Sequence, residues 1–257
     1  MFGGIPLRTP QELAIMREAG RIVGQVLERL KAMTAPGMTT LDLDAAAEEF
    51  IRSRGGKPAF KGYTSAGRPP FPASICASVN DGVVHGIPDD RMLASGDIVS
   101  IDVGVEHQGF FADSAATISV GDVSAKTAKL MRVCREALDR AIGQARPGNA
   151  LGKIGEAVQR HVEANGFSVV RDFVGHGIGT AMHQAPEVPN FKTKRCPDLV
   201  MEPGLVLAIE PMINAGGYRV EVKPDAWPVR TADGKRSAHF EHTVAVTPDG
   251  HEILTLP

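Results

Sequence analysis

Two stretches near the start of the chain carry apolar residues at helical spacing. The first begins at Thr9, where Pro10 and Glu12 complete the pattern of a capping box. The apolar residues that then fall on one helical face are Leu13, Met16, Val23, Leu27 and Leu30. The second stretch covers residues 39–56 and is closed by Gly55, a residue type that commonly ends helices. We therefore predict two consecutive helices in this part of the chain.

The rest of the chain alternates between strand patterns and helix patterns. Short apolar runs bounded by turn residues predict strands, and longer amphipathic runs predict helices. Strands are expected at residues 75–79, 83–87, 98–120 as a hairpin, 167–175, 204–213 and 239–247. Two further helices are expected at residues 124–145 and 149–166, the second with Asn149 as its N-cap and its end near Gly166. This mixture predicts an α/β chain of the α+β type.

Two helical segments, one in each half of the chain, resemble each other. Residues 35–56 align without gaps with residues 146–167, at an offset of 111 positions. The matched pairs are Pro36 with Pro147, Gly37 with Gly148, Leu43 with Ile154, Ile51 with Val162 and Gly55 with Gly166. Two unrelated helices with common end residues would be the ordinary explanation. A true duplication predicts a single domain over residues 1–257, with related halves at about 9–120 and 121–257 and a site between them.

The predicted hairpin at residues 98–120 carries one aspartate in each strand. If the chain turns at His107 and Gln108, Asp102 and Asp113 lie directly opposite each other, with their side chains on one face about 5 Å apart. Like charges in that position repel, and burial removes their hydration. A shared proton or a shared metal ion would offset both effects. The ordinary explanation is that one aspartate faces solvent or caps a turn.

Other strands and turns also carry polar residues in apolar surroundings. Glu210 follows five apolar residues, and Glu241 precedes a strongly apolar strand. His85, His176 and His183 lie in or after glycine-bounded segments, where other groups can approach closely. Each of these residues alone is explained as a solvated strand end or as a hydrogen-bonded loop histidine. Taken with the two aspartates, they form a candidate site.

The four carboxylates and His176 make a carboxylate-rich set of metal ligands. Their combined charge of −4 would be neutralised by two divalent cations. Oxygen and imidazole ligands suit Mn²⁺, Fe²⁺, Co²⁺ or Zn²⁺, whereas a structural zinc site is usually rich in cysteine. Two such ions about 3.5–4 Å apart can share one water, lower its pKa and polarise a carbonyl. The set therefore predicts a hydrolase.

Composition narrows the class of protein further. A net charge of −2, with 43% hydrophobic and 23% charged residues, is ordinary for a globular protein and gives no indication of nucleic acid or a membrane surface as partner. The first residues lack the apolar core of a signal peptide, and no apolar run approaches the about 18 residues of a membrane span. Cys76, Cys134 and Cys196 lack disulfide-framework or CxxC spacing, which predicts a reduced, cytoplasmic compartment.

Seven short motifs resemble those of a known family. They are "VVHGIPDD", "GDIVSIDVGV", "GFFADSA", "FVGHGIG", "MHQAPEVP", "LVLAIEPMINAG" and "FEHTVAVT". Through them, and over essentially its whole length, the chain resembles the type I methionine aminopeptidases. The resemblance implies the pita-bread fold, in which two pseudo-twofold halves carry antiparallel sheets covered by helices. It implies a hydrolase that uses a metal-bridging hydroxide to remove the N-terminal methionine of peptides and nascent chains when the second residue is small.

The resemblance also assigns the metal ligands. It implies two divalent ions, which can be Co, Mn, Fe or Zn. Asp113 and Glu241 would bridge both ions. Asp102 would bind one ion, and His176 with Glu210 would bind the other.

Further residues match family positions around the metals. Glu210 would relay a proton, His183 would steady the tetrahedral intermediate, and His85 would assist the leaving amine. The walls of the methionine pocket would include Phe71, Cys76, Phe173, Met182 and Trp227. For each of these wall residues, ordinary core packing is the alternative explanation.

The chain departs from the family pattern at three positions, and two other classes of protein are competing explanations. The chain differs from many members at Arg68, Gly104 and Met182, which affects the pocket rim and the hydrogen bonds around the ligands. An Xaa-Pro aminopeptidase or prolidase would share the fold, but those enzymes carry a separate N-terminal domain. A binding protein could keep the fold without catalysis, although such proteins lose metal ligands.

The resemblance implies a setting for the enzyme as well. It implies a cytoplasmic monomer that associates transiently with the ribosome and binds neither nucleic acid nor membranes. The N-terminal zinc-binding extension of some members has no counterpart in the sequence, so docking through such a module is not expected.

Overall fold

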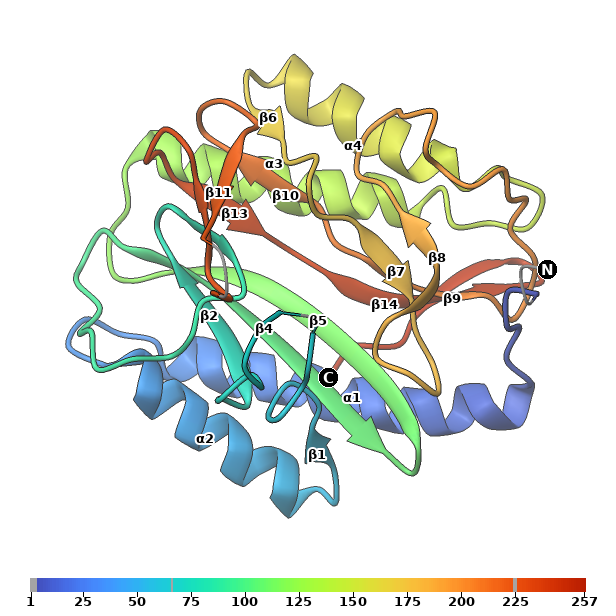
Figure 1. Ribbon diagram of the computed structural model, residues 1–257, viewed down its shortest axis with the longest axis horizontal. Helices are drawn as coiled ribbons and strands as arrows, with labels where there is room; N and C mark the ends of the chain where they lie inside the picture. The colour runs from blue at the N-terminus through green and yellow to red at the C-terminus, as the bar shows by residue number, and fades with distance from the viewer. Residues whose placement is uncertain (1–3, 66, 224–225) are drawn as a thin grey trace.

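The computed structural model describes residues 4–65, 67–223 and 226–257. Its helices are α1 (Pro10–Met33), α2 (Thr40–Ser53), α3 (Ala125–Ile142) and α4 (Gly152–Ala164). Its strands are β1 (Lys57–Pro58), β2 (Ile75–Val79), β3 (Gly82–Val84), β4 (Ile98–His107), β5 (Phe110–Ser119), β6 (Ser168–Val169), β7 (Gly175–Gly177), β8 (Gln184–Val188), β9 (Val206–Ile209), β10 (Met212–Asn214), β11 (Val220–Val222), β12 (Val229–Thr231), β13 (Ser237–His239), β14 (His242–Thr247) and β15 (Gly250–Ile253). The helices lie in two pairs along opposite edges of the view, with the strands between them (Figure 1).

The helix ends follow from local hydrogen bonds, with one exception to the sequence prediction. The capping box of α1 is confirmed, because the N–H of Glu12 donates to Thr9 Oγ1 at 3.3 Å and the N–H of Thr9 donates to Glu12 Oε2 at 2.7 Å. Gly55 ends α2 in the left-handed region with φ of 76°. The expected cap at Asn149 is wrong, because its side chain instead donates to the carbonyl of Gln144 at 3.0 Å. Helix α4 begins later and has no side-chain cap among the described residues.

Every strand pair in the described residues is antiparallel, and two sheets meet in the middle of the molecule. Strands β1, β2 and β5 all pair with β4, and a second sheet has the order β15-β14-β9-β7-β8. The sheets join where Glu241 and Ala115 exchange backbone hydrogen bonds of 2.9 and 3.4 Å. Smaller sheets, β13-β10-β6 and β11-β12-β3, complete the fold. Side chains of β5 and of the segment before β14 therefore lie close together.

The β4–β5 hairpin has a different register from the one that the sequence suggested. The turn is formed by Gln108 and Gly109, both with positive φ, at 50° and 82°. These signs at both central residues are those of a type I′ turn, whose twist matches that of the strands. Gly104 therefore lies opposite Asp113, and the predicted direct opposition of Asp102 and Asp113 is wrong. The two aspartates are diagonal neighbours on the same face of the hairpin.

Each pair of helices covers one sheet face with an apolar core. Under α1 and α2, the alternate residues Val99, Ile101 and Val103 of β4 are fully buried in one cluster. Under α3 and α4, Leu207 and Ile209 of β9 belong to a second cluster. Burial of each such side chain stabilises the fold by about 1.5–3 kcal/mol. The intervening residues of the same strands point away from the helices, toward the site described below.

The same pattern of backbone hydrogen bonds occurs in the segment after α1 and in the segment after α3. Two matched pairs of backbone bonds join Gly37 and Met38 to Leu93, and Gly148 and Asn149 to Met201. Gly37 and Gly148 both have positive φ, at 92° and 82°. This correspondence supports the predicted duplication, although the division into two halves of one domain stays a prediction.

In the part of the chain that the structure describes, no helix has both the length and the apolar character needed to cross a membrane.

Candidate metal centre

The predicted ligands converge on one cavity on the sheet faces that point away from the helices. The cavity has a volume of about 190 Å³. Its lining includes all five predicted ligands, which are Asp102, Asp113, His176, Glu210 and Glu241. It also includes His85 and His183, together with Phe71, Cys76, Met182 and Trp227 from the predicted pocket. Phe173 is not among the lining residues, since its ring packs edge-on against His85 with 5.6 Å between centroids.

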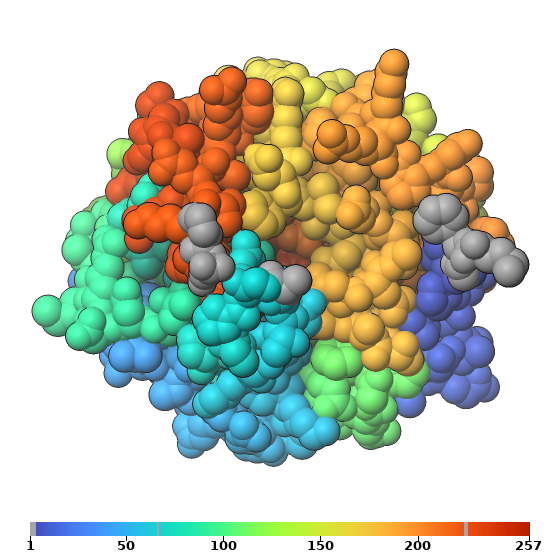
Figure 2. Space-filling model, viewed as in Figure 1, coloured from blue at the N-terminus to red at the C-terminus, as the bar shows by residue number. Residues whose placement is uncertain are grey.

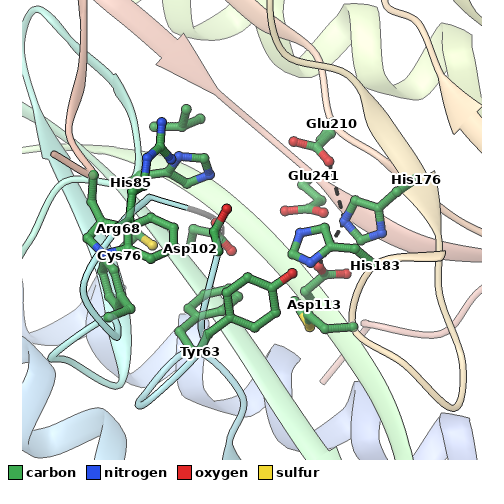
Figure 3. Close-up of a pocket in the computed structure, with 16 residues that line it drawn as sticks. Tyr63, Arg68, Cys76, His85, Asp102, Asp113, His176, His183, Glu210 and Glu241 are labelled. Atoms are coloured by element: carbon green, nitrogen blue, oxygen red, sulfur yellow. Dashed lines mark ion pairs between the residues drawn. The ribbon is translucent and has the colours of Figure 1, made fainter. Parts of the chain in front are cut away.

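Different strands supply the ligands, and the sheet pairing brings them together. Asp102 comes from β4 and Asp113 from β5, on the face opposite the apolar core. His176 comes from β7, which pairs with β9 just before Glu210. Glu241 directly precedes β14, which pairs with β9 on its other side. Figure 3 shows Asp113, His176, Glu210 and Glu241 gathered on one side of the cavity and Asp102 on the other.

His176 is oriented to bind a cation through one nitrogen. Its Nδ1 lies 2.9 Å from the carbonyl oxygen of Gly177, so Nδ1 must carry the hydrogen that it donates. Its Nε2 then faces the carboxylates, at 3.5 Å from Asp113 Oδ2 and 3.6 Å from Glu210 Oε1. Ligand atoms of Asp113, His176 and Glu241 all lie within 4.8 Å of one another. A backbone acceptor that fixes the imidazole in this way is typical of metal-binding histidines.

The raised pKa values of three carboxylates show that their ionised forms are destabilised when no cation is present. Burial, reinforced by the charges of neighbouring carboxylates, raises the pKa of Asp102 and of Glu241 well above the ordinary range. Burial also raises the pKa of Glu210 to about 8, with the Asp113 charge acting in the same direction and His176 opposing it. For His176, burial lowers the pKa, but the bond to Asp113 and the nearby carboxylates outweigh it and raise the pKa to about 9.

The donor set fits divalent cations. Oδ1 of Asp102 is buried and lacks a hydrogen-bond partner among the described residues, although it is a strong acceptor. Glu241 and Asp113 are each 2% exposed. Buried carboxylates at this density are stable as anions only when positive charge lies among them. Oxygen and imidazole donors suit the divalent metals of hydrolytic sites.

Hydroxyl groups hold the ligands in place, and the sequence analysis did not find them. Thr243 Oγ1 lies 3.2 Å from Asp113 Oδ1 and accepts a hydrogen bond of 3.0 Å from the Asp113 backbone N–H. The hydroxyl of Ser114 donates to the carbonyl of Glu241. Such outer contacts fix the direction of ligand side chains. They join residues that are distant in sequence, so no local pattern indicates them.

A further histidine, His239, lies behind the carboxylates and was also missed. Its Nε2 is 3.8 Å from Glu210 Oε2 and 4.0 Å from Glu241 Oε2. Burial lowers its pKa to about 3, with a smaller contribution from His85, so its ring is neutral near pH 7. Its place two residues before Glu241, on the same side of an extended chain, is the signal that could have found it.

His183 and His85 flank the cavity as neutral rings. The His183 ring lies 4.3 Å from that of His176 and 5.2 Å from that of Tyr63, measured between centroids. Burial lowers the pKa of His183 to about 4, and the charge of His176 adds to the effect. Burial likewise lowers the pKa of His85 to about 4, with Arg68 contributing. Both imidazoles can therefore donate and accept hydrogen bonds near pH 7.

The remaining wall of the cavity is apolar and aromatic. Phe71 packs edge-on against Trp227 at 5.4 Å between centroids, and Phe60 packs against Phe71 at 6.5 Å. A Cβ added at Gly104 would come within 2.8 Å of Phe60 and 3.0 Å of Met182. Glycine at that position therefore leaves the space in which these two side chains pack. The sequence analysis missed Phe60 and Tyr63 as lining residues.

The fold and the site together are those of a metal-dependent peptidase. The chain matches the model of metallopeptidase family M24 over residues 14–248, and it belongs to that family. A methionine aminopeptidase of Clostridium perfringens is 52% identical over 98% of this chain and 99% of its own length. The crystal structure of a methionine aminopeptidase from Thermotoga maritima has a TM-score of 0.94 at 42% identity and covers 99% of this chain. Within family M24, the chain therefore belongs with the methionine aminopeptidases, as its motifs indicated.

A more distant likeness shows the fold alone. The prolidase of Pyrococcus furiosus has a TM-score of 0.77 at 22% identity, and this chain covers 65% of it. The pita-bread fold predicted from the motifs is confirmed by these structural comparisons.

Proposed function

We propose that the protein is a metal-dependent aminopeptidase that removes the N-terminal methionine from peptides and nascent chains when the second residue is small. The observation that carries this proposal is the small cavity with two kinds of lining. It combines four carboxylates and His176 with aromatic and apolar side chains. At about 190 Å³ the cavity is smaller than the about 300–1,000 Å³ of sites for drug-sized ligands. It suits one apolar side chain beside a charged terminus.

The proposed ligands hold two divalent ions, which can be Co, Mn, Fe or Zn. Asp113 and Glu241 would be ligands to both ions, Asp102 to one, and His176 with Glu210 to the other. The close approach of Asp113, His176 and Glu241, within 4.8 Å, supports this assignment. When bound, such ions lower the pKa of a water molecule and polarise the scissile carbonyl.

Three side chains are proposed to act on the substrate directly. His183 donates a hydrogen bond to the amide oxygen, on which negative charge develops during attack. His85 assists departure of the amine. Glu210 holds and transfers the proton, which its buried position favours by raising its pKa. The neutral state of both histidines near pH 7 supports these roles.

The aromatic wall is proposed to bind the methionine side chain. Phe71, Cys76, Met182 and Trp227 line it, and a polarizable thioether packs favourably against aromatic edges. Phe173 supports His85 from behind. The second residue must be small because the His183 ring is packed between His176 and Tyr63.

Peptide cleavage after metal exchange tests the proposal. The protein is stripped of metal, re-supplied with one cation at a time, and assayed on Met-Ala-Ser, Met-Leu-Ser and Ala-Pro-Ser peptides. Cleavage of Met-Ala-Ser well above Met-Leu-Ser, with the divalent ions named above, is the expected result. Faster release of alanine from Ala-Pro-Ser would instead support an enzyme of the Xaa-Pro aminopeptidase type.

The proposal extends to the cellular setting. All three cysteines are free, which suits a reducing compartment such as the cytoplasm. We expect a monomer that meets nascent chains at the ribosome without binding nucleic acid or membranes. Sedimentation of the protein alone, and then with ribosomes, measures both properties.

A further inference from the structure

Residues 61–65 and 67–72 lie at the rim of the cavity, and backbone hydrogen bonds join the two stretches near their outer ends. The N–H of Gly62 donates to the carbonyl of Phe71 at 2.8 Å, and the N–H of Phe71 donates to the carbonyl of Tyr63 at 2.9 Å. On the opposite side, Trp227 Nε1 donates to the carbonyl of Pro69 at 2.8 Å. In Figure 2, residues of these stretches border the central hollow from below, in cyan. The described residues on both sides of position 66 therefore border the entrance and are held there by hydrogen bonds.

Arg68 is the cationic side chain that these stretches place in the cavity lining. Its backbone N–H donates to the carbonyl of Ser65 at 3.1 Å. Its guanidinium carbon lies 5.1 Å from the centre of the Trp227 ring, and the side chain is half-buried. Its charge also lowers the pKa of His85, so the guanidinium acts on the same part of the cavity as His85. Figure 3 shows Arg68 beside His85, across the cavity from Glu210 and His176.

The charge of Arg68 is not balanced by the described parts of the chain. Surface arginines such as Arg17 and Arg230 pair with carboxylates at 2.6 and 3.2 Å. Arg68 forms no ion pair with a carboxylate within residues 4–65, 67–223 and 226–257. The carboxylates deep in the cavity would be balanced by the proposed metal ions. A half-buried cation at the mouth of a cleft attracts anionic ligands more strongly than an exposed one.

We propose that Arg68 determines specificity by binding a carboxylate of the peptide downstream of the scissile bond. This inference rests on the proposed function, because that function fixes the direction of the substrate. The free amine goes to the carboxylate and metal side, and the methionine side chain goes to the aromatic wall. The residues after the second one must therefore leave through the rim, where Arg68 lies. The carboxylate can be an acidic side chain or the terminal carboxylate of a short peptide.

Steady-state cleavage of matched peptides tests this inference. The metal-loaded wild-type protein is compared on Met-Ala-Asp-Gly-amide, Met-Ala-Asn-Gly-amide and Met-Ala-Lys-Gly-amide. We expect kcat/KM for the Asp peptide to exceed that for its Asn isostere by about fivefold at low salt, and the Lys peptide to be the poorest. Because exposed charge interactions are screened, this ratio should fall toward one at about 1 M salt. Met-Ala-Gly as free acid and as amide reveals whether a terminal carboxylate is recognised too.

Substitutions assign the effect to the side chain. Arg68→Gln should abolish the preference for Asp over Asn, measured as the ratio of kcat/KM for the two peptides, and Arg68→Lys should retain part of the preference. Arg195→Gln is the matched control, since Arg195 is exposed and outside the cavity lining. Equal cleavage of the Asp and Asn peptides by the wild type would overturn the inference and leave the proposed function intact. Failure to cleave any methionyl peptide would overturn both.

Discussion

Burial has opposite effects on stability at the two faces of the β4–β5 hairpin. On the face toward α1 and α2, Val99, Ile101 and Val103 lose water to a close-packed cluster, and each burial stabilises the fold. On the other face, Asp113 is buried and Asp102 is half-buried beside further carboxylates, and desolvation raises the pKa of Asp102. The same strands therefore carry a stabilising face and a destabilising one.

This difference indicates that the carboxylates of the acidic face serve a function other than stabilising the fold. A sheet gains nothing from four crowded carboxylates unless cations lie among them. Changes on the acidic face should therefore alter metal content and turnover, whereas changes on the apolar face should alter stability. The substitutions below are arranged by their expected effect on turnover per folded molecule.

Glu241→Gln should have the largest effect on turnover. It removes a carboxylate proposed to contact both ions, so we expect loss of bound metal and at least an about thousandfold fall in kcat/KM. The metal-free variant should be no less stable than the metal-free wild type, because one source of charge repulsion is gone. Metal analysis, peptide cleavage and thermal melting measure these effects. Glu106→Gln, at an exposed ion pair with Lys57, is the control.

Asp102→Asn should affect the two metal ions unequally. The proposed geometry gives Asp102 to one ion only, so the affinity for that ion should fall by at least about tenfold, a loss seen even for outer contacts. The other ion should bind with nearly unchanged affinity. Calorimetric titration of the metal-free protein resolves the two steps. Equal weakening of both would contradict the assignment.

His183→Ala should separate metal binding from catalysis. The ring lies against His176 but is not a proposed ligand, so both ions should remain bound. Loss of a donor to the developing oxyanion should lower kcat by about a hundredfold to a thousandfold. Metal analysis and kcat measure the two effects, with His251→Ala as the control. Release of metal by His183→Ala would show that the assigned role is wrong.

Ile101→Ala should have the smallest effect on turnover and a clear effect on stability. Ile101 is fully buried under the helices, so its truncation should lower the free energy of unfolding by about 2–5 kcal/mol. Metal stoichiometry and turnover of the folded fraction should match the wild type. Denaturant unfolding checks the first expectation and active-site assays check the second. A loss of bound metal would mean that the two faces are not independent.

The sequence predicted the site better than it predicted the local geometry. Carboxylates such as Glu210 interrupt apolar strands, and this mismatch between a charged residue and its apolar neighbours can be read from the sequence alone. The hairpin register was missed because it depends on Gln108 taking a positive φ together with Gly109. The cap was wrongly placed at Asn149, whose side-chain amide donates to the carbonyl of Gln144 instead.

Contacts between segments that are distant in sequence could not be predicted from any local sequence pattern. Thr243 supports Asp113 across 130 positions, and Tyr63 meets His183 from a loop in the other half of the chain. Phe173 was placed in the pocket wall by its motif, but in the structure it lies outside the cavity lining and packs against His85 and an apolar cluster that includes Val84. The residue types of a site are therefore predictable where its supporting contacts are not.

The pH dependence of stability, with and without metal, tests most directly whether cations stabilise the acidic face. In the metal-free protein the raised pKa values of Glu210, at about 8, and His176, at about 9, mean that the folded state holds protons that the unfolded state releases. Asp102 and Glu241 act in the same direction. Stability must therefore fall as pH rises from about 6.5 to 8, by about 1.4 kcal/mol per pH unit for each proton retained.

Histidines with lowered pKa, such as His85 and His183, act in the opposite direction only while their unfolded rings, with a pKa of about 6.5, still hold protons, so their contribution fades as pH rises from 6.5 to 8. The measurement is denaturant unfolding at several pH values between 6.5 and 8, for chelated and for metal-loaded protein. The account predicts a stability that falls with pH in the chelated protein and stays nearly level in the metal-loaded protein. Parallel profiles for the two forms would contradict it.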